Sequence, residues 1–175
     1  MTVCKKEEGR TPELCVLHLK PAPAYDVVFG AAGCAKEGKS VSGDTHSLTR
    51  ISDDRFLLAL CDGMGSGEAA EKTSSMAISL VENFYRAGFD SESILSAVNR
   101  LLNVGSDDNF AALDICAIDL SGGVCDFIKL GSPQGYIKGR TSTDVIESNA
   151  PPIGILEEVT PTITTKSVEA GDIIV

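Results

Sequence analysis

Residues 57–72, LLALCDGMGSGEAAEK, run from an apolar stretch through an aspartate and a glycine-rich turn into helix-forming sequence. The apolar stretch before Asp62 predicts a buried strand, and apolar residues recur from 68 to 87 with the spacing of an amphipathic helix that ends at Gly88. The turn contains three glycines, which let the backbone bend sharply and approach a bound ion or phosphate: Gly63, Gly65 and Gly67. The stretch therefore predicts a strand, a turn and a helix with a carboxylate at the junction.

The sequence before this stretch predicts a β-hairpin that carries a second aspartate. Residues 44–51 and 55–62 read as its two strands, with the turn between them. If the turn is centred on Asp53, Asp44 lies directly opposite Asp62, with Cβ atoms about 4.5–5.5 Å apart. Two carboxylates this close repel each other unless a cation lies between them, and a divalent metal ion is the natural candidate. We therefore expect a metal site at Asp44 and Asp62.

The residues around the aspartates favour Mg²⁺ or Mn²⁺ over zinc. Oxygen ligands predominate there, and His46 and Cys61 do not make a metal-binding cluster. We interpret His46 as a partly buried strand residue. A P-loop, an EF-hand and a dinucleotide fingerprint each lack required residues in this stretch. A tight turn in which the aspartate only caps the following helix remains an open alternative.

The rest of the chain predicts an α+β domain. Two strand-like runs, 13–20 and 25–35, precede the hairpin, a second helix starts at Asp90 or Ser91, and short strands follow from residue 110 onward. This order is typical of an antiparallel sheet with helices packed on it.

Length and composition limit the class of protein. The 175 residues suffice for one domain, which we expect to span 13–175 after a flexible N-terminal segment, 1–12. A net charge of −10 argues against a nucleic-acid partner. The six cysteines lack zinc-ligand spacing and suit a reducing cytoplasm. Because no apolar stretch is long enough to span a bilayer, we expect no membrane contact by this segment.

Six stretches resemble a known family, in consistent order between residues 14 and 175: VSGDTHS, LALCDGMGSGEAA, FAALDICAIDL, LGSPQGYIKG, APPIGIL and EAGDIIV. They are similar to the phosphatase domain of the stage II sporulation protein E family, which belongs to the metal-dependent protein phosphatases related to type 2C. The resemblance implies an α+β fold, a four-layer αββα sandwich of two antiparallel sheets flanked by helices. It also implies that the helix pair within 66–103 is a regulatory switch beside a metal site.

The resemblance further implies a dinuclear site with two Mn²⁺ or Mg²⁺ ions in the complete domain. Its metal ligands here would be Asp44, Asp62 and the carbonyl of Gly63. Asp44 and Asp62 would then be the catalytic residues, acting through a metal-activated water. In the family, AGDIIV leads into a second Asp-Gly and a later aspartate that also bind the metals. Because this chain ends at Val175, we expect a C-terminally truncated domain that lacks part of its metal site.

The implied reaction is hydrolysis of phosphoserine or phosphothreonine in a protein. The implied substrate is a phosphorylated anti-anti-sigma factor, in sporulation or sigma-factor control. The implied location is a cytoplasmic domain of a protein that can be membrane-tethered, and a homodimer is compatible with the sequence. The alternative is a non-catalytic regulatory module that keeps the phosphatase fold and binds a partner protein.

Overall fold

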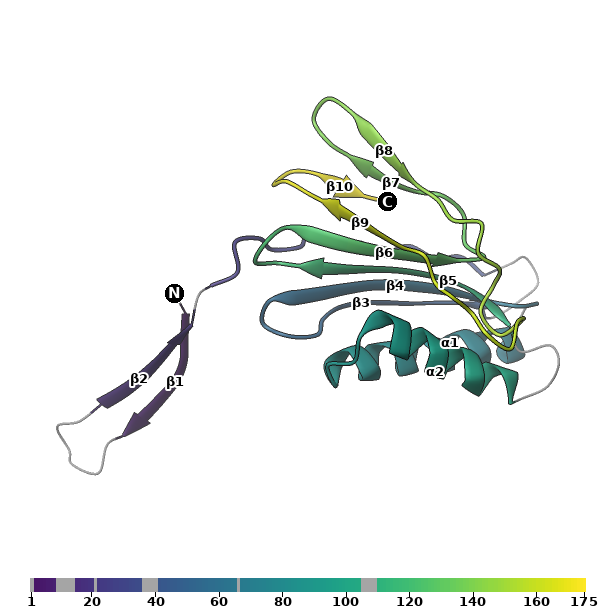
Figure 1. Cartoon of the computed structure of the whole chain (residues 1–175), viewed down its shortest axis with the longest axis horizontal. Coiled ribbons are helices and arrows are strands. Elements are labelled where there is room, and N and C mark those ends of the chain that lie inside the picture. Colours follow the sequence, from purple (N-terminus) through teal and green to yellow (C-terminus); the bar gives the residue numbers. More distant parts are fainter. Residues whose placement is uncertain (1, 9–14, 21, 36–40, 66, 105–109) are drawn as a thin grey trace.

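The computed structural model describes residues 2–8, 15–20, 22–35, 41–65, 67–104 and 110–175, and Figure 1 shows them arranged in layers. Two helices cover one face of a five-stranded antiparallel sheet, and a three-stranded antiparallel sheet lies over the other face. The predicted α+β fold, with two antiparallel sheets and helices packed on a sheet face, is therefore confirmed. The expected second layer of helices has no counterpart among the described residues.

The large sheet has the strand order β3-β4-β5-β6-β9, and its members are β3 (Asp44–Arg50), β4 (Arg55–Gly63), β5 (Ala111–Asp119), β6 (Val124–Leu130) and β9 (Ile163–Ser167). The second sheet has the order β10-β7-β8, with β7 (Gly135–Lys138), β8 (Thr143–Ile146) and β10 (Ile173–Ile174). A separate hairpin pairs β1 (Thr2–Glu8) with β2 (Cys15–Lys20).

Strand β4 is apolar on both faces because it lies between two layers. Its residues on the helix side belong to the core beneath the helices: Leu57, Ala59 and Cys61. On the other side, Phe56 and Leu58 pack in the core between the sheets. Further along that face, Leu60 is 48% exposed, so the face opens toward the end of the strand that carries Asp62.

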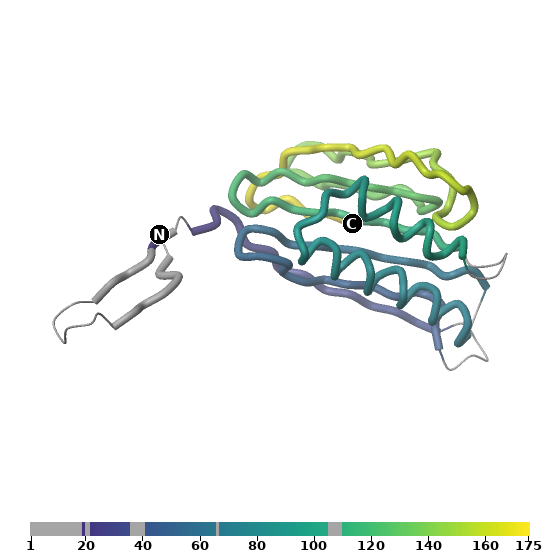
Figure 2. The backbone as a smooth tube through the Cα atoms, turned by 60° about the horizontal axis from the view of Figure 1, so that its bottom comes forward, coloured from purple at the N-terminus to yellow at the C-terminus, as the bar shows by residue number. Residues whose placement is uncertain are grey.

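The helices α1 (Glu68–Arg86) and α2 (Ser91–Asn103) lie side by side along the strands, as Figure 2 shows. Gly88, with a φ of 84°, follows α1, and Asp90 caps α2 by accepting a hydrogen bond of 2.9 Å from the Ser93 amide. Both predicted helix boundaries are therefore confirmed. Ser66, the first residue of the segment 66–103 that the family resemblance assigns to the helix pair, lies outside the described residues. Neither helix combines the length and the apolarity that a membrane crossing needs, within the part of the chain the structure describes.

Two N-terminal segments differ from the sequence-based expectation. Thr2–Glu8, within the segment 1–12 that we expected to be flexible, forms β1 because Cys15–Lys20 offers it an antiparallel partner. The run 25–35, expected to be a strand, is not paired as one with any described segment, although the Tyr25 amide donates to the carbonyl of Leu120 in the turn after β5. A strand needs a neighbour for its backbone groups, and an apolar pattern does not show whether one is present.

Candidate metal site at the end of the β3–β4 hairpin

The hairpin of β3 and β4 brings the two predicted site aspartates together. Asp44, the first residue of β3, lies directly opposite Asp62, the last but one of β4. The predicted register, centred on Asp53, is therefore confirmed. Continuous pairing from Asp44 to Arg50 keeps both aspartates on the face that looks toward the second sheet, and both are exposed.

The two carboxyl groups lie close enough to interact strongly. Partial burial raises the pKa of Asp62, and a hydrogen bond with the Asp44 side chain and the Asp44 charge raise it further. The negative charge also acts on the neighbouring thiol, because burial, Asp62 and Asp44 together raise the pKa of Cys61 to about 12. A proton between the carboxyl groups relieves their repulsion, and a divalent cation would serve the same purpose.

Glycines allow the turns beside both aspartates to press against the first turn of α1. A Cβ on Gly63 would collide with the carbonyl oxygen of Ala70 and lie 2.8 Å from its carbonyl carbon. The Gly63 amide donates to the Gly43 carbonyl at 3.2 Å, and a Cβ on Gly43 would lie 3.3 Å from the Gly63 oxygen. Gly65 and Gly67 have φ values of 94° and 84°, which favour glycine. The glycines are therefore required by close packing and by backbone conformation.

The alternative in which an aspartate caps the helix is wrong. Gly67 occupies the N-cap of α1, and no side chain of the described residues caps this helix end. Asp62 instead projects from the sheet face opposite the helices, since Cys61, its neighbour in the strand, is buried beneath them.

The oxygen donors fit a hard divalent cation. The described residues contain no group of three or more His, Cys, Asp or Glu that could hold a metal ion, so they offer two carboxylates at this point. The carbonyl of Gly63 follows Asp62 directly in the chain. Two carboxylates, a carbonyl and several waters form a coordination shell that Mg²⁺ accepts, because Mg²⁺ keeps part of its hydration shell in proteins.

An ion pair that no sequence motif predicted lies on the same sheet face. Asp114 of β5 lies opposite Leu60, and Lys129 of β6 lies opposite Asp114. The Lys129 ammonium donates to Asp114 Oδ2, and the lysine side chain is only 3% exposed. One signal could have found it, because Cys125, Phe127 and Lys129 occupy alternate positions of β6 and a charge at such a buried position needs a partner.

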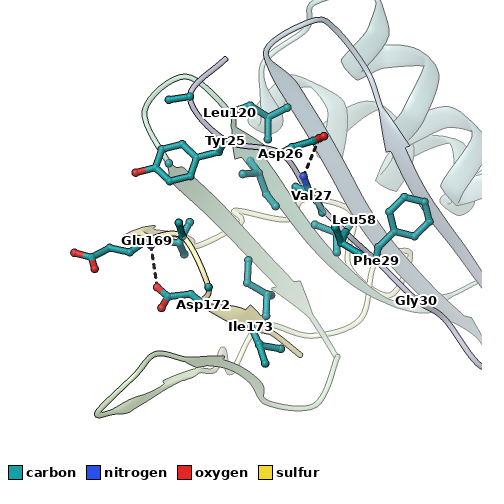
Figure 3. A pocket seen from close by; sticks show the side chains of 18 residues that line it. Tyr25, Asp26, Val27, Phe29, Gly30, Leu58, Leu120, Glu169, Asp172 and Ile173 are labelled. Carbon is teal, nitrogen blue, oxygen red and sulfur yellow. Dashed lines mark hydrogen bonds between the residues drawn. The ribbon is translucent and has the colours of Figure 1, made fainter. Parts of the chain in front are cut away.

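A separate pocket of 520 Å³ lies between the segment 24–30 and the β9–β10 connection (Figure 3). Its floor is apolar and consists of Leu58, Ile118 and Leu120. Neither Asp44 nor Asp62 lines it. The pocket and the aspartate pair are therefore different features of the space between the sheets.

The sequence comparisons point to one family. A sequence model of the family described as Stage II sporulation protein E (SpoIIE) matches residues 52–175. The chain is 32% identical over 153 residues to stage II sporulation protein E of Bacillus subtilis (strain 168), which covers 87% of the chain and 18% of that protein. It is 31% identical over 176 residues to the protein of the same name from Priestia megaterium, which covers 99% of the chain and 30% of that protein. The chain thus spans less than a third of the length of these relatives.

Solved structures agree with this family in fold. The PP2C phosphatase domain of SpoIIE from Bacillus subtilis, solved with a fragment of its regulatory domain, has a TM-score of 0.75 and 32% identity, covering 83% of this chain and 43% of that one. RsbX in complex with magnesium has a TM-score of 0.68 and 24% identity, covering 79% of this chain and 67% of that one, which shows the shared fold alone. Family model, relatives and fold all agree, and the chain belongs to the stage II sporulation protein E (SpoIIE) family.

Proposed function

We propose that the chain is the core of a metal-dependent protein phosphatase domain that hydrolyses phosphoserine or phosphothreonine in a partner protein. The observation that carries this proposal is the direct opposition of Asp44 and Asp62 at the open end of a hairpin. Membership of the SpoIIE family supports it, as does the phosphatase domain of the related solved structure. Asp44, Asp62 and the Gly63 carbonyl are the proposed ligands of Mn²⁺ or Mg²⁺.

The cation, the two aspartates and Gly63 would have separate roles in the site. A bound divalent cation neutralises phosphoryl oxygens and lowers the pKa of an attacking water, so no side-chain nucleophile is needed. Asp44 and Asp62 hold their positions because seven consecutive residue pairs fix the hairpin register. Gly63 lets the turn lie against α1, since a Cβ at this position would collide with the backbone of Ala70. The site is thus built on two rigid elements, which favours defined geometry.

For the substrate, we propose a phosphorylated anti-anti-sigma factor. The chain is 39% identical over 67 residues, 38% of its length, to the phosphoserine phosphatase RsbX of Bacillus subtilis, of which the match covers 32%. The family resemblance of the sequence motifs supports the same class of substrate.

Release of phosphate from a radiolabelled phosphoserine protein tests the proposal. We expect the intact domain to release phosphate with Mn²⁺ or Mg²⁺ but not with a chelator, and we expect Asp62→Asn to abolish release because a charge that holds the cation is removed. Asp126→Asn is the matched control, since Asp126 lies on the helix side of the same sheet, where it accepts a hydrogen bond from Thr165. Unchanged turnover in Asp62→Asn would refute the proposed role.

The same preparation distinguishes a catalytic domain from a non-catalytic module. Calorimetry measures Mn²⁺ binding without turnover. Binding that depends on Asp62, together with no release from any phosphoserine protein tested, would favour the module that binds a partner.

A further inference from the structure

We propose that Asp114, held by Lys129, is a positioning residue that acts through water on a cation bound by Asp44 and Asp62. The inference rests on the proposed function, because it concerns the same cation. It assigns a role to an ion pair that neither the sequence motifs nor the proposed ligands explain.

The strand register places Asp114 beside the aspartate pair. Asp62 lies opposite Ala112 on β5, and Leu60 lies opposite Asp114. Asp114 is therefore the diagonal neighbour of Asp62 on the same face, at about 7–8 Å between Cα atoms. Ala112 carries only a methyl group, so no larger side chain of β5 stands between the two carboxylates. A water molecule bound to a cation at Asp62 could bridge that separation.

Lys129 is buried where stability alone does not require a charge. Apart from Asp114, its neighbours on this face of β5 and β6 are apolar, and Cys116 and Phe127 are both 5% exposed. Replacing such a buried ion pair by apolar residues is often neutral or stabilising, because two charges must be taken out of water. A Cβ on Gly135 would lie 3.3 Å from Lys129 Nζ, so the start of β7 closes over the ammonium. A pair kept at this cost suggests a role beyond packing.

The Asp114 carboxylate is turned partly toward water. Its side chain is 28% exposed, whereas that of Lys129 is 3% exposed. Oδ2 accepts the Lys129 hydrogen bond, and Oδ1 has no hydrogen-bond donor among the described residues. Lys129 therefore holds one oxygen and leaves the other available to a water molecule on the open face.

We assign Asp114 to the water shell of the cation and not to its direct ligands. It forms no metal-binding group with the other His, Cys, Asp or Glu side chains of the described chain. Residues that contact a metal through its ligands and waters change metal affinity typically by 10–100-fold when mutated. Asp114 is therefore assigned to the hydration shell.

Calorimetric titration of the intact domain with Mn²⁺ tests this role, with Asp62→Asn defining the site. We expect Asp114→Asn to raise the Kd about tenfold and Asp126→Asn to leave it within twofold. Lys129→Met tests the direction in which Mn²⁺ affinity changes. If the pair acted only through charge, removing the lysine would tighten Mn²⁺ binding; if Lys129 positions Asp114, its loss weakens binding.

The double variant Asp114→Asn/Lys129→Met leaves no unpaired buried charge and guards against a folding defect. We expect it to match Asp114→Asn in Kd, with thermal unfolding in the absence of metal confirming the fold. Tighter binding by Lys129→Met, or an unchanged Kd in both Asp114 variants, overturns the inference while the proposed function stands. A wild-type intact domain without Mn²⁺ binding at Asp62 overturns both. Binding at Asp62 that responds to Asp114 as expected, without phosphate release, supports the inference and refutes the catalytic function.

Discussion

Replacing Gly63 by alanine would bring a methyl group into steric clash with the backbone of α1 at Ala70. The new Cβ would collide with the Ala70 carbonyl oxygen and lie 2.8 Å from its carbonyl carbon and 3.1 Å from its Cα. Carbon atoms pack at about 3.5–4.0 Å, so α1 must move away from β4 by at least about 0.7 Å at this point. All three atoms belong to helix backbone, so no side-chain rotation relieves the contact.

We expect Gly63→Ala to destabilise the chain by about 3 kcal/mol, the upper end of the usual cost of overpacking. For a chain of this size that corresponds to a fall in Tm of roughly 6–12 °C. The sequence has no tryptophan, so urea unfolding followed by the circular dichroism of the two helices is the suitable assay. Gly65→Ala is the control, because its Cβ meets no atom within 4 Å and its cost comes from a φ of 94° alone, about 1–2 kcal/mol.

A double-mutant cycle with Ala70→Gly separates the two close glycines. A Cβ on Gly43 would lie 3.0 Å from the Ala70 Cβ, so Ala70→Gly should rescue part of the cost of Gly43→Ala. It should not rescue Gly63→Ala, since that clash is with backbone. Stability of Gly63→Ala within about 0.5 kcal/mol of wild type, or its rescue by Ala70→Gly, would show that the reasoning is wrong.

Three further expectations concern other titratable or hydrogen-bonding side chains. Burial and the two aspartates raise the pKa of Cys61 from 9.0 to about 12, so folded stability should fall as the pH rises from 9 to 12. A thiol reagent at mildly alkaline pH should modify the exposed Cys34 but not the buried Cys61. A hydrogen bond from Arg86 lowers the pKa of the Glu82 carboxyl below its usual 4.5. The contribution of this carboxylate to folded stability is therefore complete above pH 4.5 and is lost as the pH falls. Urea unfolding of Glu82→Gln should show a loss of about 1 kcal/mol at neutral pH and none in acid; an equal loss at both would contradict this. Asn99, 1% exposed, makes three hydrogen bonds to the segment 154–157, so Asn99→Ala should cost roughly 2–3 kcal/mol and speed amide exchange there, and unaltered exchange would count against it.

Local chemistry was enough to predict the hairpin and the helices. A strand has a side-chain period of two, so a short turn at Asp53 fixes that Asp44 faces Asp62. Glycine after one helix and an aspartate before the next mark their ends, because these residues satisfy backbone groups near them in the chain. The aspartate pair, as a juxtaposition, was therefore determined by sequence alone.

Contacts between distant segments were decided only by the tertiary structure. Lys129 meets Asp114 because β5 pairs with β6 in one register, and Gly63 must be glycine because Ala70 packs on it from the next element. The run 25–35 has the pattern of a strand but no strand partner among the described residues. A sequence pattern indicates which faces of a segment can be buried or paired. Which segment pairs with it depends on how the rest of the chain folds, and local propensity does not contain this information.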